Sequence, residues 1–184
     1  MRVIAGEAGG VPLVAPRGLA TRPTSDKLKA AIFSSLGDLG CEGRVLDLFA
    51  GSGGLGIEAL SRGADWCDFV DSSTAACRAI RANLEKTRLA DRASVHSMPV
   101  ERFISAPAAK GPYDLILLDP PYALQGLPEL LMHIGSGVLV APGTALLVEH
   151  SNRTTHPAQI GPLTQEKTRT HGDSAFTLYL LRSL

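Results

Sequence analysis

Hydrophobic residues recur along the chain in two alternating patterns. Short runs rich in apolar and β-prone residues, typical of strands buried in a parallel sheet, occur at 45–49, 66–70, 93–96, 115–118 and 145–149. Most of the segments between them carry apolar residues three or four positions apart, which predicts helices. Strand and helix therefore alternate along the chain, as they do in a doubly wound sheet.

Capping residues predict where the helices begin. A first helix is expected after Thr24 or Ser25, and the longest one after Ser72 or Ser73, because hydroxyl side chains can accept hydrogen bonds from the free amides of a first helical turn. Pro99 suits the first turn of a further helix. The remaining helices are expected at about 55–62 and 127–134.

Two pairs of β-prone segments lie near the ends of the chain. Residues 165–170 and 175–181 flank the turn sequence His171-Gly172-Asp173, and residues 2–5 and 11–14 flank a glycine-rich stretch, so both pairs predict antiparallel hairpins. The pattern as a whole predicts an α/β fold with a doubly wound, mostly parallel, seven-stranded sheet, a C-terminal antiparallel hairpin and a small N-terminal β-hairpin.

Composition narrows the class of protein. A chain of 184 residues with 45% hydrophobic content suffices for one domain with a sizeable core. The formal net charge is zero, so any nucleic-acid contact must come from local basic patches. Cys41, Cys67 and Cys77 lack metal-ligand spacing and are typical of thiols in a reducing cytosol. We see neither a signal peptide nor an apolar stretch of membrane-spanning length, so we expect a cytoplasmic protein. The five histidines are scattered along the chain and form no ligand cluster, so we expect that the protein needs no metal.

A glycine-rich loop follows the first expected core strand. Gly51, Gly53 and Gly56 match the pattern G-x-G-x-x-G between a strand and a helix, which favours a dinucleotide or another adenosine cofactor. Asp71 ends the next strand, where its carboxylate can accept hydrogen bonds from a ribose. The alternative is that Asp71 serves only as an acid at the start of the following helix.

Asp47 lies four residues before the first glycine of this loop. A carboxylate is unfavourable beside a pyrophosphate but favourable beside a cofactor that carries positive charge and no phosphate. S-adenosylmethionine is such a cofactor, because it carries a sulfonium and an ammonium group. Asp47 could hold the ammonium, directly or through water, or it could only brace the loop.

The fourth core strand ends in Asp119-Pro120-Pro121-Tyr122. The strand brings a carboxylate to the carboxyl edge of the sheet, where open α/β sheets bind ligands, and the prolines stiffen the following turn. A fixed carboxylate, backbone carbonyls and an aromatic ring can together hold a flat base that carries an amine. A strand that simply ends in a proline-rich turn with a packed tyrosine is the alternative.

These motifs resemble the amino N-methyltransferases that use S-adenosylmethionine. Further stretches narrow the resemblance to the RsmD family, which methylates the guanine N2 amine in a loop of bacterial 16S ribosomal RNA. It covers nearly the whole chain and rests on Asp47-Leu48-Phe49-Ala50-Gly51-Ser52-Gly53, Asp119-Pro120-Pro121-Tyr122, Thr21-Arg22-Pro23-Thr24-Ser25-Asp26-Lys27, Leu60-Ser61-Arg62-Gly63-Ala64 and His171-Gly172-Asp173. The sequence departs from the family at His171, where tyrosine is expected, and at Ser97-Met98, where related enzymes often carry an acid.

The resemblance implies a Rossmann-like class I methyltransferase fold and a set of site residues. Asp119 and the Pro120 carbonyl would accept the two N–H bonds of the guanine amine, and Tyr122 would stack on a base turned out of its stack. The residues implied to contact the cofactor are Asp47, Phe49, Ala50, Gly51, Ser52, Gly53, Asp71, Ser72, Ser97, Met98 and Asp119.

Basic residues near both ends of the chain are candidates for RNA contact. Residues 1–23 are expected to form a hairpin and basic arm beside a methyltransferase domain over 24–184. The candidate RNA-binding residues are Arg17, Arg22, Lys27, Arg153 and Arg169, with Lys167 and His171 near the last two. The implied partner is 16S rRNA or the assembled 30S subunit, and we expect the protein to act as a monomer.

Three other functions are compatible with parts of the sequence. A DNA or other RNA methyltransferase acting on adenine N6 or cytosine N4 would use the same tetrapeptide. The DNA enzymes usually need a sizeable target-recognition domain, for which this chain has little room. A nicotinamide-dependent oxidoreductase would use the glycine loop but leave Asp119 and Tyr122 without a role. A catalytically silent RNA-binding module is disfavoured by the same two residues.

Overall fold

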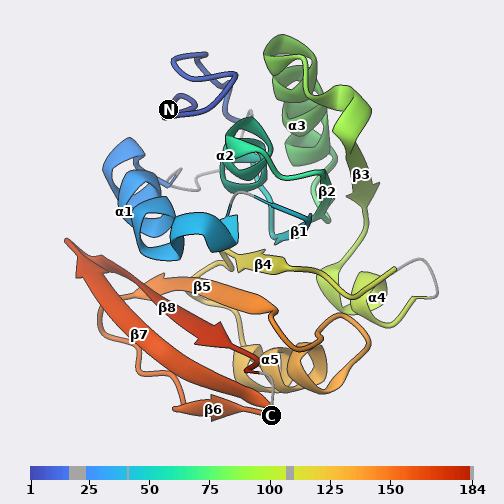
Figure 1. The fold of residues 1–184 in the computed structure, drawn as a ribbon. Helices are drawn as coiled ribbons and strands as arrows, with labels where there is room; N and C mark the ends of the chain where they lie inside the picture. Colours follow the sequence, from blue (N-terminus) through green and yellow to red (C-terminus); the bar gives the residue numbers. More distant parts are fainter. Residues whose placement is uncertain (17–23, 41, 107–109, 183–184) are drawn as a thin grey trace.

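The computed structural model describes residues 1–16, 24–40, 42–106 and 110–182. In these residues one eight-stranded sheet runs through the molecule, with helices on both faces (Figure 1). Its strands are β1 (Arg44–Leu48), β2 (Trp66–Asp71), β3 (Ala93–Ser97), β4 (Leu115–Leu118), β5 (Ala145–Ser151), β6 (Gln159–Ile160), β7 (Leu163–His171) and β8 (Ser174–Leu180). The helices are α1 (Asp26–Leu36), α2 (Gly54–Arg62), α3 (Thr74–Thr87), α4 (Val100–Ile104) and α5 (Leu127–Ser136), with short 3-10 turns at Gly37–Gly40 and Ala90–Arg92. None of the described helices has the length and apolar composition needed to span a bilayer.

The strand order is β3-β2-β1-β4-β5-β8-β7-β6. The first five strands are parallel, and β8, β7 and β6 each pair antiparallel to their neighbour. From β1 the chain proceeds outward through β2 and β3, then returns to place β4 on the other side of β1. The carboxyl ends of β1 and β4 therefore meet at the point where doubly wound folds bind ligands.

The predicted α/β fold class is confirmed, with three local corrections. The sheet has eight strands rather than seven, because the two-residue β6 is too short to produce a periodic signal. Pro99 is the N-cap of α4 and does not lie in its first turn. At the N-terminus, antiparallel pairing is reduced to one bridge between Arg2 and Pro12, with flanking backbone bonds such as Val3 N to Val11 O at 3.0 Å.

Alternation along the strands decides which side chains reach the site. In β4, Leu115 and Leu117 pack in the core beneath α1, α2 and α3, whereas Ile116 and Leu118 pack against α4 and α5. Successive side chains of a strand point to opposite faces. Asp119, two positions beyond Leu117, therefore belongs to the α1 side of the sheet.

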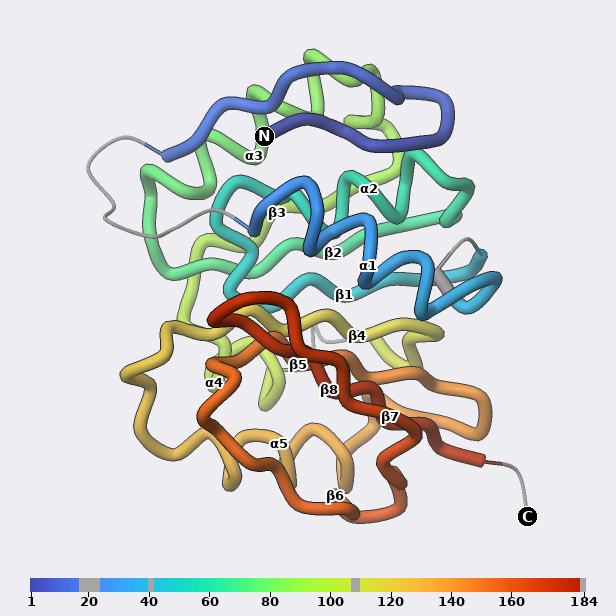
Figure 2. The backbone as a smooth tube through the Cα atoms, turned by 90° about the vertical axis from the view of Figure 1, so that its left-hand side faces the viewer, coloured from blue at the N-terminus to red at the C-terminus, as the bar shows by residue number. Residues whose placement is uncertain are grey.

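The N-terminal segment 1–16 lies over α2 and α3 (Figure 2). The buried Glu58 of α2 accepts hydrogen bonds from Ile4 N at 2.7 Å and Ala5 N at 3.0 Å, and its Oε2 lies 3.4 Å from Lys29 Nζ. Val3 of this segment is fully buried in the core that it shares with α1 and α2. The predicted domain boundary after residue 23 lies outside the described residues.

Candidate active site at the carboxyl edge of the sheet

Four carboxylates mark the carboxyl ends of neighbouring strands. Asp47 lies in β1, Asp71 ends β2, Asp119 directly follows β4, and Glu149 lies in β5. The residues two positions before them, Val45, Phe69, Leu117 and Leu147, all lie in the core that α1, α2 and α3 cover. All four carboxylates are therefore directed to that face of the sheet. The edge where the parallel strands end is therefore acidic on this face.

The glycine loop between β1 and α2 turns through left-handed backbone. Gly51 and Gly53 have φ values of 57° and 77°, and Phe49 has φ 57° although it is not a glycine. Gly53 N donates to Ala50 O at 2.7 Å, which closes the turn directly before α2. A phenylalanine rarely adopts the left-handed backbone conformation, and backbone strain of this kind is often found at ligand-binding loops.

Asp71 ties this loop to the start of α3. Its Oδ2 accepts a hydrogen bond from Gly51 N at 2.9 Å, and its Oδ1 accepts one from Ser73 N at 2.8 Å. A carboxylate offers about four lone-pair positions, so Asp71 keeps acceptor capacity for a hydroxyl group. Ser73, not Ser72, is the N-cap of α3, and Ser72 is exposed beside Asp71.

Asp47 stabilises the glycine loop through a hydrogen bond from the buried side of the loop. Its side chain is buried, with 1% exposure, and its Oδ2 accepts a hydrogen bond from Gly56 N at 2.9 Å. Its Oδ1 has no hydrogen-bond partner among the described residues. Burial raises the pKa of this carboxyl well above its usual range. A donor that reached Oδ1 would therefore be favourable for the charged form.

Asp119 and Glu149 share one hydroxyl group. Thr24, the residue before the N-cap of α1, lies with its Oγ1 3.0 Å from Asp119 Oδ2 and 3.2 Å from Glu149 Oε2. Leu118 of β4 pairs with Val148 of β5, so the next residues on the two strands are Asp119 and Glu149. Burial raises the pKa of Asp119 to about 6, and the hydrogen bond from Thr24 opposes this shift.

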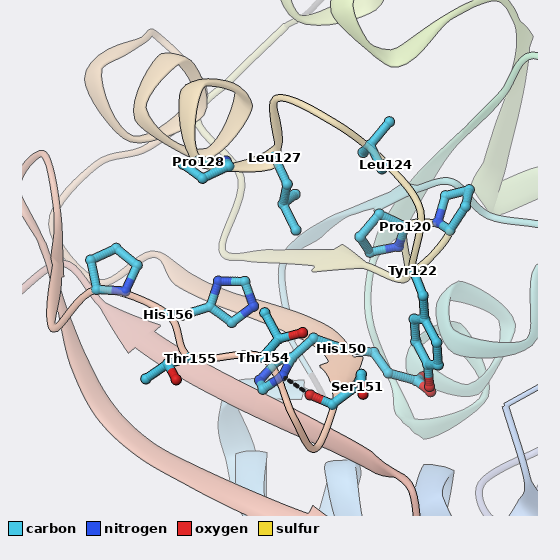
Figure 3. A pocket seen from close by; sticks show the side chains of 13 residues that line it. Pro120, Tyr122, Leu124, Leu127, Pro128, His150, Ser151, Thr154, Thr155 and His156 are labelled. Atoms are coloured by element: carbon cyan, nitrogen blue, oxygen red, sulfur yellow. Dashed lines mark hydrogen bonds between the residues drawn. The ribbon is translucent and has the colours of Figure 1, made fainter.

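A cavity of about 190 Å³ opens beside these carboxylates (Figure 3). It lies between the loop after β4, which contributes Pro120 and Tyr122, and the segment after β5, which contributes His156. The Tyr122 side chain is 62% exposed, and its hydroxyl lies 2.8 Å from Ser174 Oγ at the start of β8. Tyr122 is thus held as an open aromatic wall that a flat ligand can reach.

The remaining residues predicted for the cofactor lie around the same edge. Ser52 lies in the glycine loop, where its carbonyl accepts a hydrogen bond from Asn83 Nδ2 at 2.9 Å, and Ala50 is buried at the start of that loop. Ser97 is exposed at the end of β3. The Met98 amide donates to Asp71 O at 3.1 Å, so this amide is already engaged.

The predicted basic residues fall into two groups. Arg17 and Arg22 lie outside the described residues. Lys27, Arg153 and Arg169 are exposed, in the first turn of α1, directly after β5 and near the end of β7. Asn152 N donates to Asp173 O at 2.9 Å, which holds the turn between β7 and β8 against the end of β5. Lys167 instead donates to Ser35 O at 2.7 Å.

Three residues of this site are not assigned to it by sequence patterns alone. The patterns mark Thr24 as a possible helix cap and Glu149 as the end of a strand, and they do not mark Ser174. Glu149 does carry the signal that marks Asp119, namely an acid directly after an apolar strand segment. Thr24 and Ser174 reach the site only through packing between distant parts of the chain.

Comparison with known proteins decides the family. The family model described as "Conserved hypothetical protein 95" matches residues 1–180. A Bacillus subtilis protein named "Putative rRNA methyltransferase YlbH" is 40% identical over 99% of this chain and 100% of its own length. The Escherichia coli K12 protein named "Ribosomal RNA small subunit methyltransferase D" is 28% identical over 97% of this chain and 89% of its own. This chain belongs to the RsmD family.

Solved structures agree with membership of the RsmD family. The structure titled "Putative methyltransferase yhhF from Escherichia coli" has a TM-score of 0.84 and 28% identity, and it covers 100% of this chain and 99% of its own. The class I methyltransferase fold that the motifs predicted is therefore confirmed. The glycine loop, Asp119 and Tyr122, which carried part of the resemblance, lie along one edge of that fold.

Proposed function

We propose that this protein transfers a methyl group from S-adenosylmethionine to the exocyclic N2 amine of a guanine in 16S ribosomal RNA of the small subunit. The observation that carries the proposal is the arrangement of Asp119, a half-buried carboxylate at the strand edge, beside the open ring of Tyr122. The names of relatives that align over nearly the whole chain support the RNA substrate.

The glycine loop and its two carboxylates fit S-adenosylmethionine better than a dinucleotide. Asp47 and Asp71 both accept hydrogen bonds from amides of this region, at Gly56 and Gly51, so a pyrophosphate there would meet two carboxyl groups. The unpartnered Asp47 Oδ1 matches a cofactor that brings donors and positive charge. Residues 49–53 would approach the cofactor through their backbone, and Asp71 would accept from its ribose. When bound, S-adenosylmethionine supplies an electrophilic methyl group on a sulfonium.

The chain's own residues would position and activate the amine. The guanine N2 lone pair is delocalised into the ring, so the free amine is a poor nucleophile. Asp119 and the Pro120 carbonyl would accept its two N–H bonds and direct the lone pair toward the methyl group, and Tyr122 would stack on the base. Positioning of this kind can supply much of a rate enhancement, and a carboxylate beside a nitrogen that becomes positive adds electrostatic stabilisation.

RNA contact is assigned to the exposed basic residues around the site. Lys27, Arg153 and Arg169 lie near the carboxyl edge of the sheet, and we keep Arg17 and Arg22 as further candidates. Such residues bind phosphates, while the base itself must be turned out of its stack to reach the site. We expect a monomer that acts in the cytoplasm on 16S RNA or on the 30S subunit.

Two measurements test this proposal. Calorimetry of the purified protein should detect binding of S-adenosylhomocysteine and no binding of NAD. Incubation of 16S RNA, 30S subunits and 70S ribosomes with labelled cofactor, followed by mass spectrometry of the nucleosides, should yield N2-methylguanosine. Methylated adenosine or cytidine would overturn the base assignment, and binding of NAD alone would overturn the methyltransferase assignment.

A further inference from the structure

We infer that Glu149 accepts a hydrogen bond from N1–H of the target guanine and thereby selects guanine over bases that carry no proton at this position. The inference rests on the proposed function and names the residue that sets its base specificity. Asp119 is assigned to the amine that is methylated, and Glu149 is assigned to the neighbouring atom of the same base edge.

The sheet register places the two carboxylates side by side. Asp119 and Glu149 directly follow the paired residues Leu118 and Val148 of β4 and β5, and neighbouring strands lie about 4.8 Å apart. Both carboxylates lie within hydrogen-bond reach of the same Thr24 hydroxyl, at 3.0 and 3.2 Å. Their oxygens are therefore close enough to accept hydrogen bonds from adjacent atoms of one base.

The pair has acceptor capacity for donors on a ligand. The Thr24 hydroxyl carries one proton, so it donates to only one of the two carboxylates at a time. An ionised carboxylate only accepts hydrogen bonds, and it has about four lone-pair positions. Two adjacent acceptors are thus directed to the same part of the site.

Among the bases with an exocyclic amine, guanine alone matches two adjacent acceptors. Its N1–H and N2 amine are neighbouring donors on one edge. Adenine and cytosine carry an unprotonated ring nitrogen, which is an acceptor, next to their amines. A carboxylate that faced that nitrogen would meet another lone pair, so the pair Asp119 and Glu149 would favour guanine and disfavour the other two bases.

Burial makes this discrimination strong. Glu149 is only 5% exposed, and it lines the same cavity as Pro120 and Tyr122. Water does not easily reach such a position to replace a missing hydrogen bond. A base that leaves the Glu149 carboxylate without a donor therefore loses far more binding free energy than it would at the surface. Sites that hydrogen-bond a particular N–H or O–H can reject analogues lacking it by large factors.

The test uses 2-aminopurine, which keeps the N2 amine but has no proton on N1. The methylated guanine is first located by mass spectrometry, and 30S particles are then reconstituted with guanine or 2-aminopurine at that position. The wild-type protein should prefer guanine by about 10²-fold or more in kcat/KM. In Glu149→Gln, the side-chain amide can donate to N1 of 2-aminopurine, so the preference should fall to within about tenfold, with S-adenosylhomocysteine affinity retained.

Controls separate this role from a structural one. Glu101→Gln, at an exposed position in the first turn of α4, should keep the full preference. A Glu149→Gln protein that keeps the wild-type preference would overturn the inference, and so would a wild-type protein that methylates both bases equally. The wild-type comparison decides the matter even if Glu149→Gln does not fold. If the wild-type protein methylates no guanine in any particle, the proposed function itself fails, which is a different result from the absence of a preference.

Discussion

At the scale of single residues, the ionisation of Asp119 should control the rate. Burial raises the pKa of Asp119 to about 6, and only the ionised carboxylate offers both oxygens as acceptors and the negative charge that favours an amine becoming positive. Single-turnover methyl transfer should therefore be full above this pH and should fall as the pH drops through about 6. Thr24→Val removes the hydrogen bond that favours the charged form, so it should move the fall to higher pH. A rate that stays flat down to pH 5, with cofactor affinity unchanged, would contradict this assignment.

Tyr122 is expected to act through its ring. Its hydroxyl is hydrogen-bonded to Ser174 Oγ at an exposed position, and such a bond contributes about 0.5–1.5 kcal/mol. Tyr122→Phe should thus lower the single-turnover rate by less than about tenfold, and Ser174→Ala is its matched control with the same expected effect. Tyr122→Ala removes the ring on which the base would stack, so it should lower the single-turnover rate severely. Equal reductions in Tyr122→Phe and Tyr122→Ala would show that the hydroxyl matters instead.

The residues of the candidate site could be predicted from the sequence where a single strand or a single motif marks them. Asp71 ends an apolar strand, Asp119 directly follows one, and Asp47 lies in the strand before the glycine loop. The sheet edge at which parallel strands end is known from the fold class. Glu149 and Thr24 were missed because their roles depend on the pairing of β4 with β5 and on the packing of α1 against both. Glu149 does carry a local signal, an acid after an apolar strand segment, but neither the strand pairing nor the helix packing leaves a local pattern in the sequence.

At the scale of elements, a buried charge network fastens the N-terminal segment to α1 and α2. Lys29 and Glu58 are fully buried 3.4 Å apart, and Glu58 also accepts from Arg62 Nε at 2.8 Å. Removing one partner of a buried pair typically costs about 3–5 kcal/mol. Glu58→Gln should therefore lower the free energy of unfolding by about that amount in urea titrations.

Two further variants make this measurement decisive. The exposed Glu101→Gln should change the free energy of unfolding by no more than about 0.5 kcal/mol. The double variant Lys29→Met, Glu58→Gln should lose less stability than the sum of its single changes, because no fully buried charge is then left without its partner, and the Arg62 side chain that also pairs with Glu58 is partly exposed. A Glu58→Gln protein as stable as Glu101→Gln would show that the network contributes little.

Elements with strong local signals were predicted almost to the residue, and weak ones were not. Ser25 and Gly37 bound α1 as their residue types suggest, and the hairpin turn at Gly172-Asp173 joins β7 to β8. By contrast, β6 exists only because a two-residue segment meets the edge of β7. The N-terminal hairpin is reduced because its backbone amides bond to Glu58 and Ser61 of α2 instead of to a second strand.

At the scale of the whole molecule, RNA binding must depend on local charge, because the net charge is zero. Replacing both Arg153 and Arg169 by glutamine should weaken RNA binding and lower the slope of log K against log salt by about one unit for each phosphate that the variant no longer binds. Charge reversal at Arg17 and Arg22 is expected to act in the same way. Lys86→Gln, at an exposed position in the last turn of α3, is the control. An unchanged salt slope would remove the tested pair from the RNA interface.

The resemblance implies that Asp119 contacts both the amine and the cofactor, and the central claim is that its essential role is on the amine. Single-turnover methyl transfer to 30S particles by Asp119→Ala, with S-adenosylhomocysteine affinity measured on the same protein, tests it most directly. We predict a rate lower by about 10²–10³ or more, as for removal of one oriented partner of the reacting group, with cofactor affinity nearly unchanged. Asp119→Asn keeps one acceptor oxygen without the charge, so it should retain part of the rate if positioning dominates. A fully active Asp119→Ala protein would contradict the account.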